Sequence, residues 1–383
     1  MSRGMYLYPW DLHEEGVETV TDRLRAAAID TVFLATAYHA GKFLRPHAPS
    51  GKVYFPHDGT VYFRPRDGMY GRLKPQAAPL VDIFDAIGSL AQKAPDLKLT
   101  SWTVGLHNTR LGLLHDDLVC RTAYGDPLFN ALCPSHPEVR DFLVSLCVDI
   151  GKERGVSEIA LETPGFQAYR HGHHHEFELV ELSPTAESLL GLCFCNACCG
   201  RARESGIDVA GLARSARTAL DRFFETGETL AGELQDDPDW AAFIDWRAEV
   251  VTSLVRRIRQ SLDASASLAV IPTVQSPNDL CWREGSDLAS LARAADRLEV
   301  PAYQVGPDDI AADMAKVRQA AGSSARIGFI LRPSWPHLRN VRDLRVCVGA
   351  AHRHEAESIS FYNYGHMRLQ SLDWIAAANG VHD

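Results

Sequence analysis

The 383-residue sequence has no run of five or more basic residues and no uninterrupted apolar stretch of about 18 residues. Its 39 Lys and Arg face 49 Asp and Glu, which gives a formal net charge of −10. Nucleic-acid binding depends on a basic face that neutralises phosphates, so this balance argues against a nucleic-acid partner. The missing apolar stretch argues against a membrane span. The N-terminal residues show no signal-peptide pattern, and we expect a cytoplasmic location.

The sequence is also a poor candidate for a disulfide framework. Nine cysteines is an odd number, and four of them fall within residues 193–199. That clustering suits a metal site in a reducing compartment better than a set of bridges. With 46% hydrophobic and 23% charged residues, a chain this long can bury a sizeable core without covalent staples.

Short apolar runs alternate with amphipathic stretches along the whole chain. Eight strands are predicted, at 4–9, 31–36, 97–104, 158–161, 267–273, 298–303, 326–331 and 358–362, each followed by a helix. Eight alternating units favour a closed (β/α)8 TIM barrel of the α/β class. The first strand–helix turn lacks a Gly-rich phosphate loop, which weighs against a dinucleotide-binding sheet.

We expect residues 1–383 to form one barrel domain with two excursions. After the second strand, segments 52–55 and 61–63 flank Asp58 and Gly59, a pattern typical of a β-hairpin. After the fourth strand, residues 184–265 predict a helical excursion within the barrel.

Aromatic and polar residues cluster where the predicted strands end, which is where barrel enzymes place their chemistry. Aromatic rings stack on the C–H faces of sugars while polar groups bind hydroxyls, so this composition predicts a carbohydrate pocket. Arg332, or Arg110, is suited to clamp a sugar carboxylate. The expected substrate-binding residues are Tyr8, Trp10, Tyr38, His39, Trp102, Asn108, His174, His175, Tyr303, Arg332, Trp335, Tyr362 and Asn363.

Two carboxylates are candidate catalytic groups. Glu162 ends the apolar run of the fourth strand, and burial among aromatic rings would raise its pKa and suit it to general acid catalysis. The alternative is a capping or salt-bridged loop residue. Asp11 follows the first strand and is either a catalytic or substrate-binding group or the N-cap of a short helix.

The run His171-Gly172-His173-His174-His175 has three interpretations. Neighbouring histidines on a loop do not have the helical spacing usual for a catalytic zinc. Substrate contact or proton transfer by His174 or His175 is favoured over metal binding, because imidazole titrates near neutral pH. The third interpretation is a solvated surface loop.

Cys193, Cys195 and Cys198 form a C-x-C-x2-C motif, three thiolates that can meet one ion. A tetrahedral site needs a fourth ligand, and a closed four-thiolate site is structural because it leaves no position for water. Buried thiols without a metal are the alternative.

The segment from Cys133 to Arg140, Cys-Pro-Ser-His-Pro-Glu-Val-Arg, resembles the CPxxPxxR stretch of glycoside hydrolase family 42, a family of TIM-barrel β-galactosidases. In that family a fourth-strand Glu and a C-x-C-x2-C cluster follow, as they do here. The resemblance implies a structural zinc held by Cys133, Cys193, Cys195 and Cys198, with Glu162 as the acid/base.

The sequence departs from that family in the seventh strand and its loop, residues 328–335, which contain no carboxylate for a nucleophile. Leu161 also stands where the family has Asn. The layout is similar to the inverting sialidases of glycoside hydrolase family 156, in which an Asp after strand one works with a His after strand three. That similarity implies catalytic roles for Asp11 and His107.

These observations predict a glycosidase that acts on a small or imported glycoside by inversion. Glu162 or Asp11 would protonate the leaving oxygen, while the other carboxylate or His107 would activate water. A sugar lyase or isomerase using the same pocket, or a non-catalytic sugar-binding barrel, are the alternatives. We expect no organic cofactor, and a homo-oligomer is left open.

Overall fold

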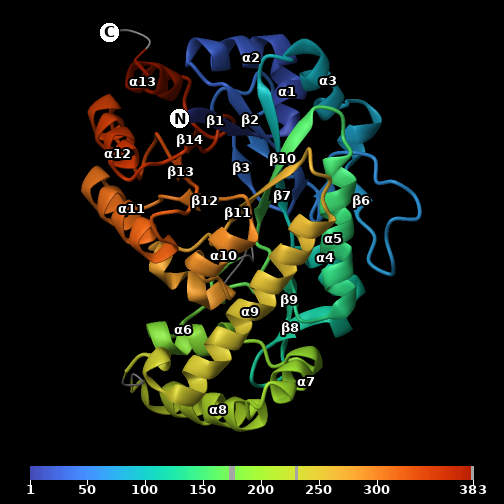
Figure 1. Ribbon diagram of the computed structural model, residues 1–383, viewed down its shortest axis with the longest axis vertical. Coiled ribbons are helices and arrows are strands. Elements are labelled where there is room, and N and C mark those ends of the chain that lie inside the picture. Colours follow the sequence, from blue (N-terminus) through green and yellow to red (C-terminus); the bar gives the residue numbers. More distant parts are fainter. Residues whose placement is uncertain (172–176, 229–231, 381–383) are drawn as a thin grey trace.

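The computed structural model describes residues 1–171, 177–228 and 232–380 (Figure 1). Eight parallel strands form a barrel that closes where the last strand pairs with the first. In order around the barrel they are β1 (Ser2–Leu7), β2 (Thr31–Tyr38), β7 (Lys98–Val104), β10 (Val156–Glu162), β11 (Ser267–Ile271), β12 (Arg297–Pro301), β13 (Ile327–Leu331) and β14 (Ser358–Phe361). The predicted (β/α)8 barrel is confirmed, and each predicted strand overlaps an observed one.

Helices surround the barrel as Figure 1 shows. They are α1 (Pro9–Glu15) and α2 (Val17–Ala26) after β1, α3 (Ala86–Lys93) after β2, α5 (Pro137–Gly151) before β10, α9 (Pro238–Ser261) before β11, and then α10 (Leu288–Ala294), α11 (Pro307–Ala321), α12 (Val341–Arg353) and α13 (Gln370–Ala378). Helix α2 buries Val17, Val20 and Leu24, which recur at helical spacing. Among the described residues, no helix is long and apolar enough to cross a membrane.

The excursion after β2 differs from the predicted hairpin. Strands β3 (Phe43–Leu44) and β4 (Val53–Tyr54) pair with each other, whereas β5 (Thr60–Val61) pairs with β2 and with β6 (Gln76–Ala77). The prediction of a hairpin between residues 52–55 and 61–63 is therefore wrong. Gly59 does turn the chain, with φ +59°. However, the Asp58 carboxylate accepts hydrogen bonds from the backbone N–H groups of Ala40 (2.9 Å) and Arg110 (2.8 Å), which tie the turn to the segment after β2 and to the start of the helix Thr109–Leu114.

Two further insertions extend the loops of neighbouring strands. After β7 come α4 (Thr109–Leu114) and an antiparallel hairpin of β8 (Val119–Arg121) and β9 (Pro127–Leu132), which the sequence did not predict. After β10 come α6 (Pro184–Gly191), α7 (Asn196–Glu204) and α8 (Val209–Thr226). In Figure 1 these helices gather at one end of the molecule near β8. They share with α9 a separate apolar cluster that includes Leu189, Leu220 and Phe243.

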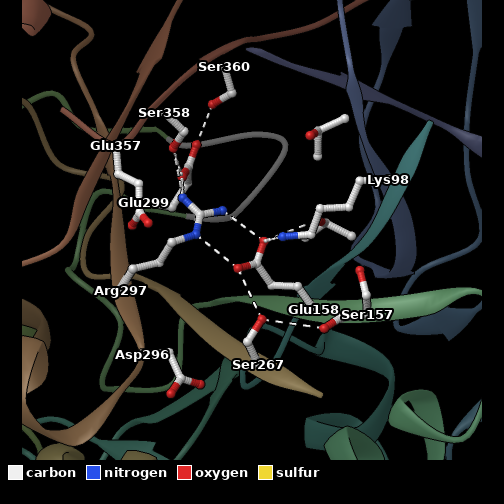
Figure 2. A network of polar contacts seen from close by, with 12 residues as sticks. Lys98, Ser157, Glu158, Ser267, Asp296, Arg297, Glu299, Glu357, Ser358 and Ser360 are labelled. Atoms are coloured by element: carbon white, nitrogen blue, oxygen red, sulfur yellow. Dashed lines mark hydrogen bonds and ion pairs between the residues drawn. The ribbon is translucent and has the colours of Figure 1, made fainter. Parts of the chain in front are cut away.

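The interior of the barrel contains a buried network of charges, which Figure 2 shows. The Arg297 guanidinium donates two hydrogen bonds to the Glu158 carboxylate, both 2.9 Å, and also bonds to Glu299 and to Ser358. Burial alone would raise the pKa of Glu158, but the bonds and charge of Arg297 outweigh it and hold that pKa at about 2. The network therefore joins β10, β12 and β14 across the barrel.

Gly328 on β13 makes room for this network. A Cβ atom at that position would lie 2.1 Å from Ser358 Oγ and 2.3 Å from a Glu299 carboxylate oxygen. The absence of a side chain on β13 thus allows three polar groups from β12 and β14 to meet inside the barrel.

Replacing Arg297 by Met should lower the free energy of unfolding by about 3–5 kcal/mol, because two buried carboxylates lose their partner. Urea denaturation followed by circular dichroism measures the loss. Arg326→Met is the matched control, since Arg326 pairs with Glu357 at the surface. That exposed pair should contribute about 1 kcal/mol or less. Equal losses in the two variants would contradict the importance of the interior network.

Candidate active site

A cavity of about 300 Å³ opens among the carboxyl ends of the barrel strands. Its apolar lining comes from the strand ends of β11, β12 and β13, through Ile271, Pro301 and Ile330. Its polar lining consists of Tyr6, Tyr38, His39, Glu162, His171, Tyr303, Arg332 and Tyr362. Six of the predicted site residues, namely Tyr38, His39, Glu162, Tyr303, Arg332 and Tyr362, are therefore brought together around one hollow.

Glu162 is the last residue of β10, and its side chain lies on the same inner face as Glu158. Its carboxylate accepts a 2.6 Å hydrogen bond from the indole Nε1 of Trp102 on β7. Burial raises the pKa of Glu162 to about 7, even though Trp102 and the charge of Arg332 both act to lower it. Near neutral pH this side chain thus exists in both protonation states and can give up or take up a proton.

Arg332 follows β13 and brings a positive charge to the opposite wall. Its guanidinium carbon lies 3.6 Å from the centre of the Tyr303 ring and 5.1 Å from that of Tyr362. One of its terminal nitrogens lies 3.2 Å from His337 Nε2. The Arg332 Nε atom is buried and meets no hydrogen-bond partner among residues 1–171, 177–228 and 232–380. An acceptor atom on a bound molecule could fill that position.

Three phenol groups meet beside the cavity. The hydroxyl of Tyr8 lies 3.0 Å from that of Tyr38 and 3.1 Å from that of Tyr362, and the last two are 3.4 Å apart. Trp10 stacks on Tyr8 with ring centres 4.3 Å apart. Tyr8 and Trp10 are buried and do not line the cavity. Tyr8 contacts Tyr38 and Tyr362, which do line the cavity, and Trp10 packs behind Tyr8.

Histidines form one side of the cavity. His39 and His171 line it, and His107 stacks on His39 at 4.2 Å between ring centres and lies 5.0 Å from His171. His39 Nδ1 lies 2.6 Å from the Ala40 carbonyl oxygen and donates a hydrogen bond to it. Burial, together with His39, lowers the pKa of His171 to about 4. His174 and His175 lie outside the described residues.

Glu284 is a second buried carboxylate near the cavity, and sequence reasoning missed it. It ends the 3-10 helix Asn278–Glu284, which follows β11. Burial raises its pKa to about 8, and the charge of Glu162 raises it further. Hydrogen bonds from Thr273, Val274 and Gln275 act in the opposite direction and lower it. No pattern in the sequence distinguishes Glu284 from a surface residue. The folded loop places it beside Phe166, whose backbone N–H donates to the Glu284 carbonyl oxygen.

The remaining predicted site residues lie elsewhere. Asp11 is buried, and its carboxylate accepts a 3.0 Å bond from the Tyr8 backbone N–H, which makes it part of the cap of α1. Asn108 likewise caps α4 through the N–H of Leu111 (2.8 Å). The side chain of Asn363 accepts a 2.9 Å bond from the Gly365 N–H within its own turn. Trp335 is 81% exposed and lies in a separate hollow.

Cys133, Cys193, Cys195 and Cys198 converge as a buried group. Their sulfur atoms all lie within 4.8 Å of one another, and Cys133 Sγ is 3.5–3.8 Å from the other three. These separations are too long for disulfides, while tetrahedral Zn–S bonds of ~2.3 Å place the sulfurs ~3.8 Å apart. The four thiols therefore fit a single metal ion. A fifth thiol, Cys120 on β8, lies beside Cys133 and Cys193 and is not one of the four.

Comparison with solved structures shows the same fold in glycoside hydrolases. The chain is 14% identical to the glycoside hydrolase domain of PgaB (BpsB) from Bordetella bronchiseptica, with a TM-score of 0.61 over 100% of this chain and 98% of that chain. It is 12% identical to α-L-fucosidase isoenzyme 2 from Paenibacillus thiaminolyticus, with a TM-score of 0.58. That match covers 99% of this chain and about half (49%) of the fucosidase chain. No protein-family model matches the sequence, and no curated protein matches it.

Replacing Trp102 by Phe should raise the pKa of Glu162 above about 7, because the indole hydrogen bond that favours the carboxylate form is lost. Carbon-detected NMR titration of glutamate carboxyl groups measures the shift, with Glu162→Gln used to assign the signal. Tyr70→Phe is a control far from the cavity, since Tyr70 donates to Asp149 instead. An unchanged or lower Glu162 pKa in Trp102→Phe would contradict this account.

Proposed function

We propose that the protein is a glycoside hydrolase in which Glu162 is the general acid. The observation that carries the proposal is the position of Glu162: a half-buried carboxyl with a pKa of about 7, in the wall of a cavity at the carboxyl end of the barrel. A protonated carboxyl there can donate its proton to the leaving glycosidic oxygen near neutral pH. With a pKa of about 7, the protonated fraction of Glu162 falls as the pH rises above that value, so activity should fall with it.

The lining of the cavity supports a sugar as the ligand. Tyr38, Tyr303 and Tyr362 offer aromatic faces and hydroxyls, and Arg332 offers donors for an oxygen acceptor. Two solved structures with the same fold, a glycoside hydrolase domain and an α-L-fucosidase, agree with this chemistry. The resemblance of residues 133–198 to glycoside hydrolase family 42 is part of the proposal, without the β-galactosidase activity of that family.

We assign water activation to the histidine side of the cavity. His39 lines the cavity, and His107 stacks on it with ring centres 4.2 Å apart. With a histidine as base and no carboxylate among residues 328–335, the reaction would proceed by direct displacement and inversion. Asp11 is not assigned to this chemistry, because its carboxylate is engaged in the α1 cap.

Purified protein should release phenol from at least one member of a panel of neutral and acidic phenyl glycosides, and Glu162→Gln should lower kcat/KM by about 10²- to 10⁴-fold. The loss should be smaller for the matching 4-nitrophenyl glycoside, because nitrophenolate leaves with less help from an acid. Glu249→Gln, which changes an exposed carboxylate on α9, should retain full activity.

Two results would contradict the proposal. Full activity of Glu162→Gln on the phenyl glycoside would remove Glu162 from the chemistry. Silence of the wild-type protein across the panel, with a new ultraviolet absorbance from an unsaturated uronate when a 4-linked oligouronide is supplied, would indicate a lyase instead.

The four-cysteine group is proposed to hold a structural zinc ion. Four thiolates close the tetrahedral shell, so the ion would stabilise the fold and take no part in the reaction. Cys133 follows β9, whereas Cys193, Cys195 and Cys198 belong to the α6–α7 segment. The ion would thus tie residues 184–265 to the hairpin after β7, consistent with one domain over 1–383. Cysteines that are not joined in disulfides persist best in a reducing compartment, which favours the cytoplasm.

The purified wild-type chain should contain about one zinc per molecule, and Cys133→Ser should lose it and unfold at a lower temperature, because three thiolates leave the tetrahedral shell open. Plasma emission spectrometry and thermal melts measure the two effects. Cys120→Ser is the matched control: it removes the neighbouring fifth thiol and should keep the zinc. Zinc loss in both variants, or in neither, would contradict the assignment of the four ligands.

A further inference from the structure

A second hollow, of about 590 Å³, lies beside the candidate active site. It is built by the loops that follow β2, β13 and β14, so it opens at the same end of the barrel as the Glu162 cavity. Leu44 comes from the first loop, Trp335 from the second and His366 from the third. We call this hollow the rim groove.

The rim groove adjoins the cavity through a short chain of contacts. His366, which lines the groove, lies with Nε2 3.3 Å from the hydroxyl of Tyr8. That hydroxyl is 3.1 Å from the hydroxyl of Tyr362, which lines the cavity. On the other wall, Arg332 of the cavity is three residues from Trp335 of the groove in the same loop. The two hollows are therefore neighbours, separated by the contacting side chains of His366, Tyr8 and Tyr362.

The chemistry of the rim groove is distinctive. Trp335 is 81% exposed, which leaves the face of a large aromatic ring open to a ligand. Arg339 and Arg368 line the groove and are both exposed. The lining includes no Asp or Glu, although the chain as a whole has a net charge of −10. The groove thus combines a stacking surface with local positive charge on an acidic protein.

We propose that the rim groove binds the continuing part of an acidic oligosaccharide whose terminal residue lies in the Glu162 cavity. Trp335 would stack on the C–H face of one sugar ring, and Arg339 and Arg368 would pair with its carboxylate or sulfate groups. Arg332, with its buried Nε lacking a partner among the described residues, continues this set of cations into the cavity. This inference rests on the proposed function and adds the substrate class to it.

Binding is measured by calorimetry and tryptophan fluorescence with tetrasaccharides of galacturonate, of mannuronate and of hyaluronan, and with neutral malto- and chito-tetraose. The protein carries Glu162→Gln so that no substrate is consumed. At least one acidic tetrasaccharide should bind more tightly than both neutral ones, and binding should weaken as salt is raised.

Three variants in this background locate the site. Trp335→Ala and the double variant Arg339→Ala/Arg368→Ala should each weaken binding about tenfold or more, as expected for the loss of stacking or of charge-assisted bonds. Arg342→Ala removes the same charge three residues from Arg339, outside the groove lining, and should bind like the parent.

Several outcomes would overturn the inference. Equal binding of neutral and acidic tetrasaccharides, no binding of any acidic one, or tighter binding of a short single-stranded DNA would each exclude an acidic glycan as the ligand of the groove. Turnover of phenyl glycosides by wild type together with no tetrasaccharide binding would leave the proposed function intact and reject the groove alone.

Discussion

The closed barrel depends on how its interior is filled, and Arg297 lies at the centre of the buried polar network there. Its guanidinium donates hydrogen bonds to Glu158 on β10, to Glu299 on β12 and to Ser358 on β14, inside the barrel. Such an arrangement is stable only when every partner is present. It also fills the end of the barrel away from the cavity with polar groups, in the space that Gly328 leaves open.

The inner face of β10 carries two carboxylates with opposite properties. Glu158 and Glu162 are four residues apart, so both side chains point inward. Glu158 receives two hydrogen bonds from a guanidinium and has a pKa of about 2, whereas Glu162 receives one from an indole and has a pKa of about 7. The pKa values differ because Glu158 is bonded by the charged Arg297 on β12, whereas Glu162 is bonded by the neutral indole of Trp102 on β7. One carboxylate is therefore suited to hold the barrel together and the other to transfer protons.

The loops around the cavity are held by contacts far from it. The four cysteines join the insertion after β7 to the insertion after β10. Arg247 on α9 lies 4.3 Å from the centre of the Phe166 ring and donates to the backbone carbonyl groups of Trp282 and Arg283. These bonds secure the turn that carries Glu284 near Glu162. The wall of the cavity is thus built by long-range packing, and the loops after β2, β13 and β14 add the more exposed rim groove.

The sequence by itself determined the barrel, because eight apolar runs separated by amphipathic helices leave few other ways to bury the strands. It also identified Glu162 as a candidate catalytic group, because a carboxyl side chain there interrupts an apolar run. The cysteine motif was equally visible as a candidate metal site, because its spacing is local. The helix caps of Asp11 and Asn108 are local contacts across three residues, whereas only the tertiary structure decided that Trp335 lies outside the cavity. It alone brought Glu284 close to Glu162 and Cys133 to the other thiols. Those outcomes depend on contacts between distant segments, and a strand pattern read along the chain contains no information about which loops meet.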